Sequence, residues 1–306
     1  MRINRYGYII NLCYENFSRV GGENKIRFID LFAGIGGFHL ALHNLGAECV
    51  FASEWDKHAR ETYEHNFKKK SPELFKNGNF VGDITQVEKK EIPDFEVLAA
   101  GFPCQPFSQV GFKKGFEDTR GTLFFDIAEI IKIKQPKAYF LENVRHVYKH
   151  DEGRTFSRIK KVLTRDLGYS FQEFIVKASD YGLPQLRPRL FMIGFRDKDL
   201  SIDTPEKKDL LFTMSNVMKG EVDRDIGYTL RVGGRASGIN DRRNWDCYRV
   251  DGKVRQLKPD EGKMMQGFPT SFEFPVSESS AMKQLGNSVA VAAVEAYARE
   301  IVKVIS

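Results

Sequence analysis

Short apolar runs alternate with longer amphipathic segments between residues 26 and about 195. The short runs have the composition of strands that are buried on both faces. In the longer segments apolar residues recur at three and four positions, which predicts helices. One such set is Leu123, Ile127, Ile130 and Ile131. The alternation indicates a doubly wound, mostly parallel α/β sheet. We expect its strands near residues 27–31, 50–53, 97–100, 138–141 and 190–194, with helices at 39–45 and 290–304.

Beyond residue 195 the pattern changes, because strands become hard to place and glycine is frequent. Basic residues gather there: between Arg231 and Arg255 seven basic side chains stand against three acidic ones. Arginines on glycine-rich loops can reach guanine edges and phosphates, so this second, smaller domain is predicted to bind nucleic acid. We expect Trp245 and Tyr248 to be core residues of that domain rather than base contacts.

Composition sets wider bounds. The 306 residues are 42% hydrophobic and 29% charged, which suits a protein with one large and one smaller domain. The net charge of +6 permits nucleic acid as a partner without requiring it. Four separated cysteines form no C-x-x-C pair, which argues against a metal site and a disulfide framework. With no apolar run long enough for a membrane span and no secretory signal, we expect a cytoplasmic protein.

Cys104 follows the apolar run 97–100, at the point where a buried strand should give way to a loop. Such strand ends face the ligand crevice of an open α/β sheet. Pro103 and Pro106 flank the Cys104-Gln105 pair, where they fix φ and remove two backbone donors. A buried structural cysteine is the alternative. The motifs described next favour a nucleophile.

A glycine-rich turn follows the first predicted strand and contains Gly34, Gly36 and Gly37. Glu54 lies 20 residues beyond Gly34, where a carboxylate can hold ribose hydroxyls. His39 occupies the place of the third glycine of the dinucleotide fingerprint, which argues against a pyrophosphate cofactor. Trp55 offers an aromatic face to an adenine, and the pair Asp83-Ile84 follows a further predicted strand and suits the adenine edge. Core packing for Trp55 and helix capping for Asp83 are the alternatives.

The order of these segments resembles the bacterial DNA cytosine-5 methyltransferase family. The residues that carry the resemblance are 32–37, 103–105, 120–124, 142–144, 185–189, 266–269 and 284–289. They extend over nearly the whole chain. The resemblance implies the fold of S-adenosylmethionine-dependent methyltransferases and an enzyme that methylates carbon 5 of cytosine in a specific duplex DNA sequence. S-adenosyl-L-methionine would be the cofactor and S-adenosyl-L-homocysteine the product.

Carbon 5 of cytosine is a poor nucleophile until a thiolate adds to carbon 6, and Cys104 fits that role. An acid at N3 lowers the barrier to this addition. Glu142 follows the apolar run 138–141, so partial desolvation should raise its pKa. Arg187 and Arg189 alternate around Pro188 and should point to one side, toward the cytosine O2 and a phosphate, where they would lower the thiol pKa. The resemblance favours Arg189 as the base contact. A structural ion pair or cap is the alternative for Glu142.

For the cofactor, Asn287 and Ser288 are expected at the start of the helix 290–304, whose N-terminus would attract the methionine carboxylate. Simple capping of that helix is compatible with this role. The resemblance implies cofactor contacts at Phe32, Gly34, Gly36, Gly37, Glu54, Trp55, Asp83, Ile84, Pro103, Leu123, Asn287, Ser288 and Val289.

Duplex DNA requires the target cytosine to leave the stack before Cys104 can reach it. Residues 105–121 are predicted to form a mobile loop that closes over the DNA, with an ordinary surface loop as the alternative. Gln109 and residues 233–237 are candidates for filling the space left by the base. We expect DNA contacts at Ser108, Gln109, Arg120, Arg231, Arg235, Arg242 and Arg243. A scaffold role is expected for Arg255, Leu257, Pro259, Glu261 and residues 266–269.

These expectations define a catalytic and cofactor-binding domain, residues 1–195 plus 278–306, and a target-recognition domain, residues 196–277. The resemblance implies a bacterial restriction-modification protein of the cytoplasm or nucleoid. We expect a monomer that has a cognate restriction endonuclease but forms no stable complex with it. Two alternatives remain. RNA-acting relatives tend to carry Pro-Pro-Cys where this chain has Phe102-Pro103-Cys104, which disfavours a tRNA methyltransferase. Intact Cys104, Glu142, Arg187 and Arg189 disfavour an inactive DNA-binding relative. The recognised DNA sequence does not follow from residue spacing.

Overall fold

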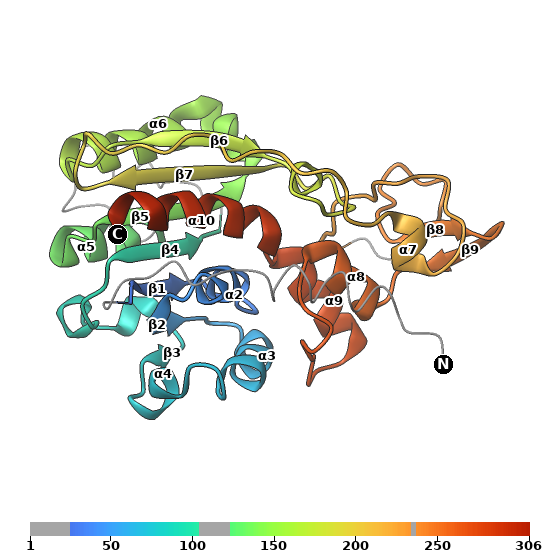
Figure 1. The fold of residues 1–306 in the computed structure, drawn as a ribbon, viewed down its shortest axis with the longest axis horizontal. Helices are drawn as coiled ribbons and strands as arrows, with labels where there is room; N and C mark the ends of the chain where they lie inside the picture. The colour runs from blue at the N-terminus through green and yellow to red at the C-terminus, as the bar shows by residue number, and fades with distance from the viewer. Residues whose placement is uncertain (1–24, 104–122, 234–236) are drawn as a thin grey trace.

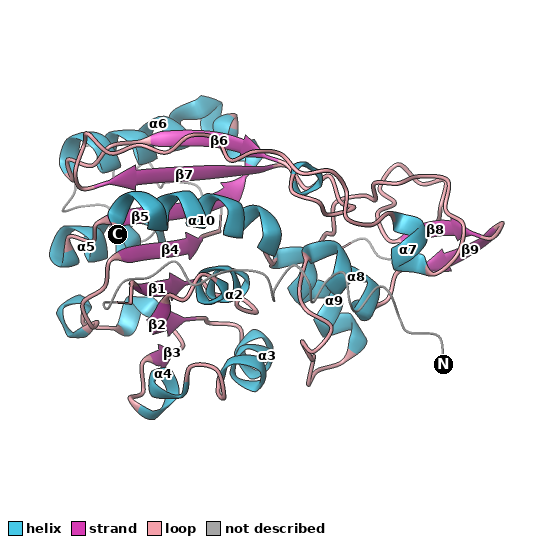
Figure 2. Ribbon diagram, in the orientation of Figure 1, coloured by secondary structure: helices cyan, strands magenta, loops and turns pink. Residues whose placement is uncertain are grey.

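A computed structural model describes residues 25–103, 123–233 and 237–306. A larger lobe is built on a β-sheet, and a smaller lobe extends from one end of it (Figure 1). Helices cover both faces of the sheet, whereas the smaller lobe consists largely of loops (Figure 2).

The sheet has the strand order β3-β2-β1-β4-β5-β7-β6. All neighbouring strands are parallel except β7, which is antiparallel to both β5 and β6. The order reverses between β1 and β4, and in open α/β sheets ligands bind outside the carboxyl ends of the strands at such a point. The strands are β1 (Arg27–Leu31), β2 (Glu48–Ser53), β3 (Phe80–Val81), β4 (Val97–Gly101), β5 (Ala138–Val144), β6 (Gln172–Val176) and β7 (Arg189–Phe195).

This sheet confirms the five predicted strands and the further strand before Asp83. Strand β6 was not predicted. It lies at the edge of the sheet, and its side chains alternate between partly exposed and exposed until Val176. Its first residues, Gln172 and Glu173, are polar, so it lacks the continuous apolar run of the central strands.

Two hydrophobic clusters fill the opposite faces of the sheet. Helices α2 (Gly37–Asn44) and α10 (Val291–Ile305) contribute to the first, which also takes in Phe28 and Phe140. Helices α5 (Leu123–Lys134) and α6 (Arg154–Lys161) contribute to the second, with Ile29 and Leu141. Alternate residues of each strand point to opposite faces. A strand buried on both faces therefore reads as a continuous apolar run.

Helices α3 (Lys57–Phe67) and α4 (Pro72–Lys76) lie between β2 and β3 along the chain. Asp56 caps α3 by accepting hydrogen bonds from the backbone of His58 and Ala59. Short 3₁₀ helices span Ile84–Gln86, Lys89–Glu91, Arg145–Tyr148, His150–Gly153 and Ala178–Asp180, and a π-helical turn spans Val162–Asp166.

The smaller lobe contains α7 (Met214–Met218), the antiparallel hairpin β8 (Cys247–Val250) and β9 (Lys253–Gln256), and α8 (Pro259–Gln266). Trp245 and Tyr248 are buried, which confirms their predicted place in the core. Arg255 pairs with Glu261 at 2.5 Å. Leu257 is also buried, in keeping with the predicted scaffold.

Helix α9 (Glu278–Asn287) packs against α8 and corrects one prediction. Asn287 is its last residue and Ser288 its C-cap, whereas α10 begins at Val291 after the N-cap residue Ala290. The prediction that Asn287 and Ser288 lie at the start of a helix is therefore wrong. The helix N-terminus that would attract a carboxylate lies instead at Ala290 and Val291.

His39 occupies the centre of a buried polar cluster under the glycine turn. Its Nδ1 lies 2.5 Å from the Tyr63 hydroxyl and its Nε2 2.9 Å from Ser71 Oγ. The ring stacks on Phe67 with centroids 4.1 Å apart. Burial, together with the charges of His43 and Lys70, lowers the pKa of His39 well below its ordinary value. His39 therefore takes up a proton less readily in the folded protein than in the unfolded chain.

We expect the His39→Gln variant to lose part of the acid sensitivity of folding. Below about pH 6.5 His39 protonates in the unfolded chain while its lowered pKa keeps it neutral when folded. The stability that it contributes is present above that pH and declines as the pH falls, by up to about 1.4 kcal/mol per pH unit. Urea unfolding between about pH 5 and pH 7 measures this slope. Equal slopes in wild type and variant would contradict the prediction, and His146→Gln, an exposed histidine, is the control.

Within the described residues, no helix combines the length and apolar character needed to cross a membrane.

Candidate active site

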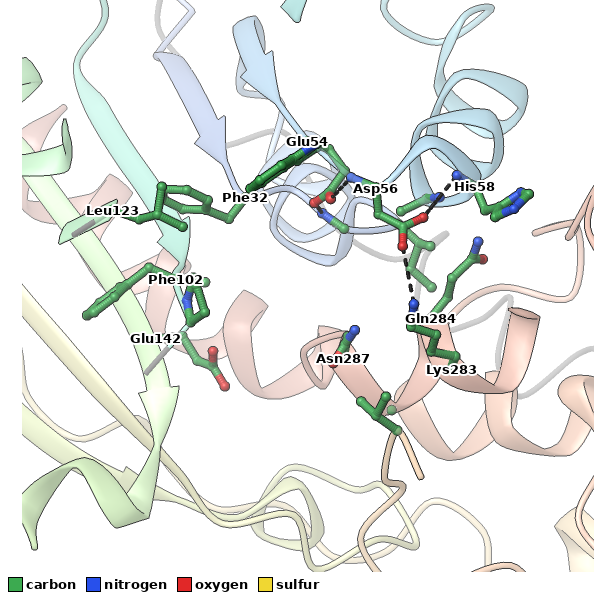
Figure 3. A pocket seen from close by; sticks show the side chains of 18 of the residues that line it. Phe32, Glu54, Asp56, His58, Phe102, Leu123, Glu142, Lys283, Gln284 and Asn287 are labelled. Carbon is green, nitrogen blue, oxygen red and sulfur yellow. Dashed lines mark hydrogen bonds and ion pairs between the residues drawn. The ribbon is translucent and has the colours of Figure 1, made fainter. Parts of the chain in front are cut away.

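A cavity of about 1090 Å³ opens at the carboxyl ends of the central strands, where the strand order reverses. Its size suits a small-molecule ligand. Glu54 and Asp56 lie on one side of it and Glu142 on the other, with Asn287 between them (Figure 3). The predicted site residues that line it are Phe32, Gly34, Glu54, Trp55, Asp83, Ile84, Pro103, Leu123, Glu142, Arg189, Arg231 and Asn287.

Glu54 fixes the shape of the glycine turn. Its Oε2 accepts a hydrogen bond from the Gly34 amide at 2.7 Å, and its Oε1 accepts one from the Asp56 amide at 2.8 Å. Gly34 has a φ of 56°, and a Cβ added there would meet nothing within 4 Å. The turn thus presents open backbone to the cavity. Burial raises the pKa of Glu54, although its backbone hydrogen bonds counteract this.

At Gly36 and Gly37 close packing against neighbouring side chains requires glycine. A Cβ on Gly36 would lie 2.3 Å from the ring of Phe67, and one on Gly37 would lie 2.5 Å from Val289 Cγ2. Neither glycine lines the cavity, and neither do Ser288 and Val289. The structure therefore places these four predicted cofactor contacts in packing beneath the cavity wall rather than on its surface.

Trp55 and Asp83 do reach the cavity. The Trp55 side chain is 75% exposed, so core packing does not explain it. Asp83 lines the cavity and also caps a 3₁₀ turn by accepting from the Thr85 amide at 2.9 Å. For Asp83 the capping alternative is correct, and its contact with the cofactor stays a prediction.

Glu142 and Arg189 form an ion pair at the other end of the cavity, with Arg189 Nε 2.9 Å from Glu142 Oε1. Glu142 is only 8% exposed. Burial raises its pKa, and the positive charges of Arg189 and Arg187 limit the rise. This agrees with the expected direction. The cavity therefore holds a carboxyl group that keeps its proton to a higher pH than an ordinary glutamate does.

Strand β4 ends beside this pair. Gly101 is the register partner of Glu142, and a Cβ on Gly101 would lie 3.5 Å from Glu142 Oε2. Asn143 Nδ2 donates to the Phe102 carbonyl at 3.0 Å, which fixes the chain as it leaves the strand. Pro103, the last described residue before Cys104, lines the cavity.

Arg187 does not face the cavity. Its buried guanidinium donates to the carbonyls of Leu230 and Gly286, at 3.1 and 2.9 Å, and to that of Ser288. The prediction that both arginines face one crevice is wrong. Alternation of side chains requires extended backbone, but Arg187 has a φ of 32° and β7 begins only at Arg189.

The structure describes three of the predicted DNA contacts. Arg231 is exposed and lines the cavity, and Arg242 and Arg243 are exposed away from it. Arg243 pairs with Asp241 at 2.7 Å, and its hydrogen bonds lower the pKa of Asp241 to about 2. Outside the described residues lie Cys104, Ser108, Gln109, Arg120 and Arg235.

Residues of α9 and of the segment 229–232 also line the cavity, and sequence reasoning did not assign most of them. Lys283 pairs with Asp56 across the cavity at 3.4 Å, and Gln284 Oε1 accepts from the Thr62 hydroxyl at 3.0 Å. The polar motif around residue 284 was a signal for Gln284. Nothing in the local sequence marks Lys283 or Thr229, because both reach the cavity only through tertiary packing.

A family model for C-5 cytosine-specific DNA methylase matches residues 26–226 and 218–303. The chain belongs to this family. It is 41% identical to the Type II methyltransferase M.HhaI of Haemophilus parahaemolyticus, over 87% of this chain and 91% of that protein. To M.HpaII of Haemophilus parainfluenzae it is 40% identical, over 95% of this chain and 93% of that protein. Both relatives match along nearly their whole length.

Solved structures show the same fold at low sequence identity. A DNMT2 mutant of Spodoptera frugiperda aligns with a TM-score of 0.67 at 19% identity, covering 90% of this chain and 99% of that one. A DNA modification methyltransferase encoded in an Escherichia coli prophage aligns with a TM-score of 0.64 at 20% identity, covering 90% of this chain and 99% of that one. The predicted fold class is confirmed.

The protein is thus a DNA cytosine-5 methyltransferase, and enzymes of this family use S-adenosylmethionine. The cavity fits that cofactor. Glu54 supplies a half-buried carboxylate, Gly34 leaves open space over its backbone, and Phe32, Leu123 and Ile84 supply apolar walls. Such a combination suits a ribose, an adenine and a methionine chain.

Proposed function

We propose that this methyltransferase acts on a flipped cytosine in a specific duplex DNA sequence, through a covalent bond between Cys104 and carbon 6. One observation carries the proposal. A single cavity joins the Glu54 side to the buried Glu142–Arg189 pair, and Pro103 lines the same cavity directly before Cys104. Methyl donor and cytosine would therefore meet beside the thiol.

The reaction begins when the Cys104 thiolate forms a bond to carbon 6 and electron density moves toward N3. Glu142, whose pKa is raised by burial, gives or shares a proton at N3. Arg189 holds the Glu142 carboxyl through Nε and has further donors for the cytosine O2. S-adenosylmethionine supplies the methyl group, which carbon 5 accepts. A water molecule acting as base then takes the carbon 5 proton, the bond between carbon 6 and Cys104 breaks to release the thiolate, and the ring becomes aromatic again.

The cofactor would lie on the side of the cavity formed by β1, β2 and β3. Glu54 is placed to accept from ribose hydroxyls, and Trp55, Asp83 and Ile84 would surround the adenine. Asn287 would contribute a side-chain amide at the methionine end. The other proposed cofactor contacts are Phe32, Gly34, Pro103 and Leu123.

Recognition of DNA is proposed for residues 196–277, and chemistry and cofactor binding for residues 1–195 and 278–306. Arg231 supports this division, because it belongs to the smaller unit yet lines the cavity. A cytosine rotated out of the duplex could enter the cavity beside it. Ser108, Gln109, Arg120, Arg235, Arg242 and Arg243 remain predicted DNA contacts.

We further propose that the protein is the monomeric modification enzyme of a bacterial restriction-modification system in the cytoplasm. Relatives named as Type II methyltransferases support this proposal. The cognate endonuclease would recognise the same sequence without a stable complex.

Methyl transfer to DNA and to tRNA tests the proposed substrate. The protein is incubated with S-adenosylmethionine carrying a tritiated methyl group and with either nucleic acid, and the product is digested to nucleosides. We expect label in 5-methyldeoxycytidine, within one sequence context that sequencing of the modified DNA then maps. Label confined to tRNA, or in another nucleoside, would refute the proposal.

A further inference from the structure

Arg187 joins two segments that are far apart in the chain. One guanidinium nitrogen donates to Leu230 O at 3.1 Å, and the other donates to Gly286 O at 2.9 Å and to Ser288 O. The side chain is 1% exposed. A single planar group therefore fixes the segment 229–232 against the end of α9.

These two segments form adjacent parts of the cavity wall. Arg231 lies on the first, within the basic region, and Asn287 lies on the second, between two of the carbonyls that Arg187 binds. The contact leaves no free space, because a Cβ on Gly286 would lie 2.5 Å from the Arg231 carbonyl. A displacement of either segment must move the other or break the Arg187 hydrogen bonds.

Two features of Arg187 are energetically unfavourable in the folded protein: its backbone conformation and the burial of its charge. Its φ of 32° lies in the left-handed region, which is unfavourable for a long side chain. Burial, with the neighbouring Arg189, lowers its pKa, and Glu142 acts in the opposite direction. Within the described residues the hydrogen bonds of its guanidinium go to carbonyls, and its buried Nε has no hydrogen-bond partner.

A passive scaffold would be served better by an uncharged side chain, since a buried cation without a paired carboxylate is expensive to desolvate. The planar set of N–H donors explains why arginine occupies this position, because a guanidinium can reach three carbonyls in one plane and a lysine cannot. We infer that Arg187 is a positioning residue that couples occupancy of the cofactor site to DNA binding by the segment 229–232. This inference rests on the proposed function.

Ligand linkage measures the coupling. Isothermal titration gives the affinity for S-adenosylhomocysteine with and without a duplex that carries the mapped target sequence. We expect the duplex to raise that affinity by a factor in the range of about 5 to 150 in wild type, and the reverse experiment must give the same factor. In Arg187→Lys the factor should fall close to one. Arg196→Lys is the matched control, because exposed Arg196 also donates to a backbone carbonyl, that of Gln135.

A scaffold role would give a different result. It would lower the melting temperature or weaken both ligands while the coupling factor stayed at the wild-type value, and this outcome overturns the inference. The inference is also overturned if the duplex leaves the affinity of the wild-type protein for S-adenosylhomocysteine unchanged. If Arg187→Lys fails to fold, Gly286→Ala decides, because it displaces the Arg231 segment with Arg187 in place and should also remove the coupling. Absence of methyl transfer to DNA would instead refute the proposed function.

Discussion

Replacement of Cys104 by serine is expected to reduce methyl transfer at least about 1000-fold. A serine hydroxyl is almost wholly protonated at neutral pH and is a far weaker nucleophile than a thiolate. Without a bond to carbon 6 the cytosine ring keeps its aromaticity, and carbon 5 cannot attack the methyl group. Single-turnover transfer of labelled methyl to DNA measures the loss. Affinity for S-adenosylhomocysteine should change little.

The covalent bond itself can be trapped. A duplex with 5-fluorocytosine at the target carries no carbon 5 proton, so the Cys104 thiolate cannot be expelled after methyl transfer. Wild type should form a complex with this DNA that survives denaturing electrophoresis, and Cys104→Ser should not. Cys247→Ser, at a buried thiol in β8, is the control and should form the complex. A stable complex with the Cys104 variant would contradict the assignment.

Glu142→Gln is expected to lower the rate of methyl transfer by about 100- to 10,000-fold, the range usual for loss of a general acid. The amide can donate a hydrogen bond to N3 but cannot transfer a proton to it. Burial raises the Glu142 pKa, so the protonated fraction decreases as the pH rises through that value. The wild-type rate should therefore carry an alkaline limit from Glu142, which the variant loses.

Single-turnover rates measured across pH with saturating cofactor test this prediction. Glu142→Asp keeps a carboxyl group but withdraws it from Arg189, and it should retain more activity than the amide variant. Arg189→Lys keeps the positive charge and loses the planar fork, so it serves as the matched test of base orientation. A Glu142→Gln rate within a few-fold of wild type would exclude Glu142 as the acid.

Much of the sheet could be predicted because its central strands are buried on both faces. Residues 97–100 and 138–141 are continuously apolar, and both segments are strands at these positions. The edge strand β6 escaped prediction, because it begins with the polar residues Gln172 and Glu173 and lacks a continuous apolar run. Asn287 and Ser288 were misplaced for another reason: both residue types favour turns, but here they lie at the C-terminal end of α9, a helix that was not predicted from the sequence.

The site was predicted in part. Glu54 and Asp83 follow strands and Glu142 lies near the carboxyl end of β5, so their positions at one edge of the sheet could be predicted from the chain. Gly36 and Gly37 come from the same motif as Gly34, yet they pack against Phe67 and Val289. Spacing identified the turn but could not separate a glycine that faces ligand from one that admits a neighbouring side chain.

By itself the sequence determined the family, the parallel core of the sheet and the residue types of the reaction, because these depend on local patterns and on motifs in a fixed order. Only the tertiary structure decided that Arg187 leaves the cavity while Arg189 pairs with Glu142. It also decided that Lys283 and Thr229 reach the cavity wall. The reason is physical. Side-chain direction at Arg187 follows from a left-handed φ that distant segments impose, and those contacts have no local signature in the chain.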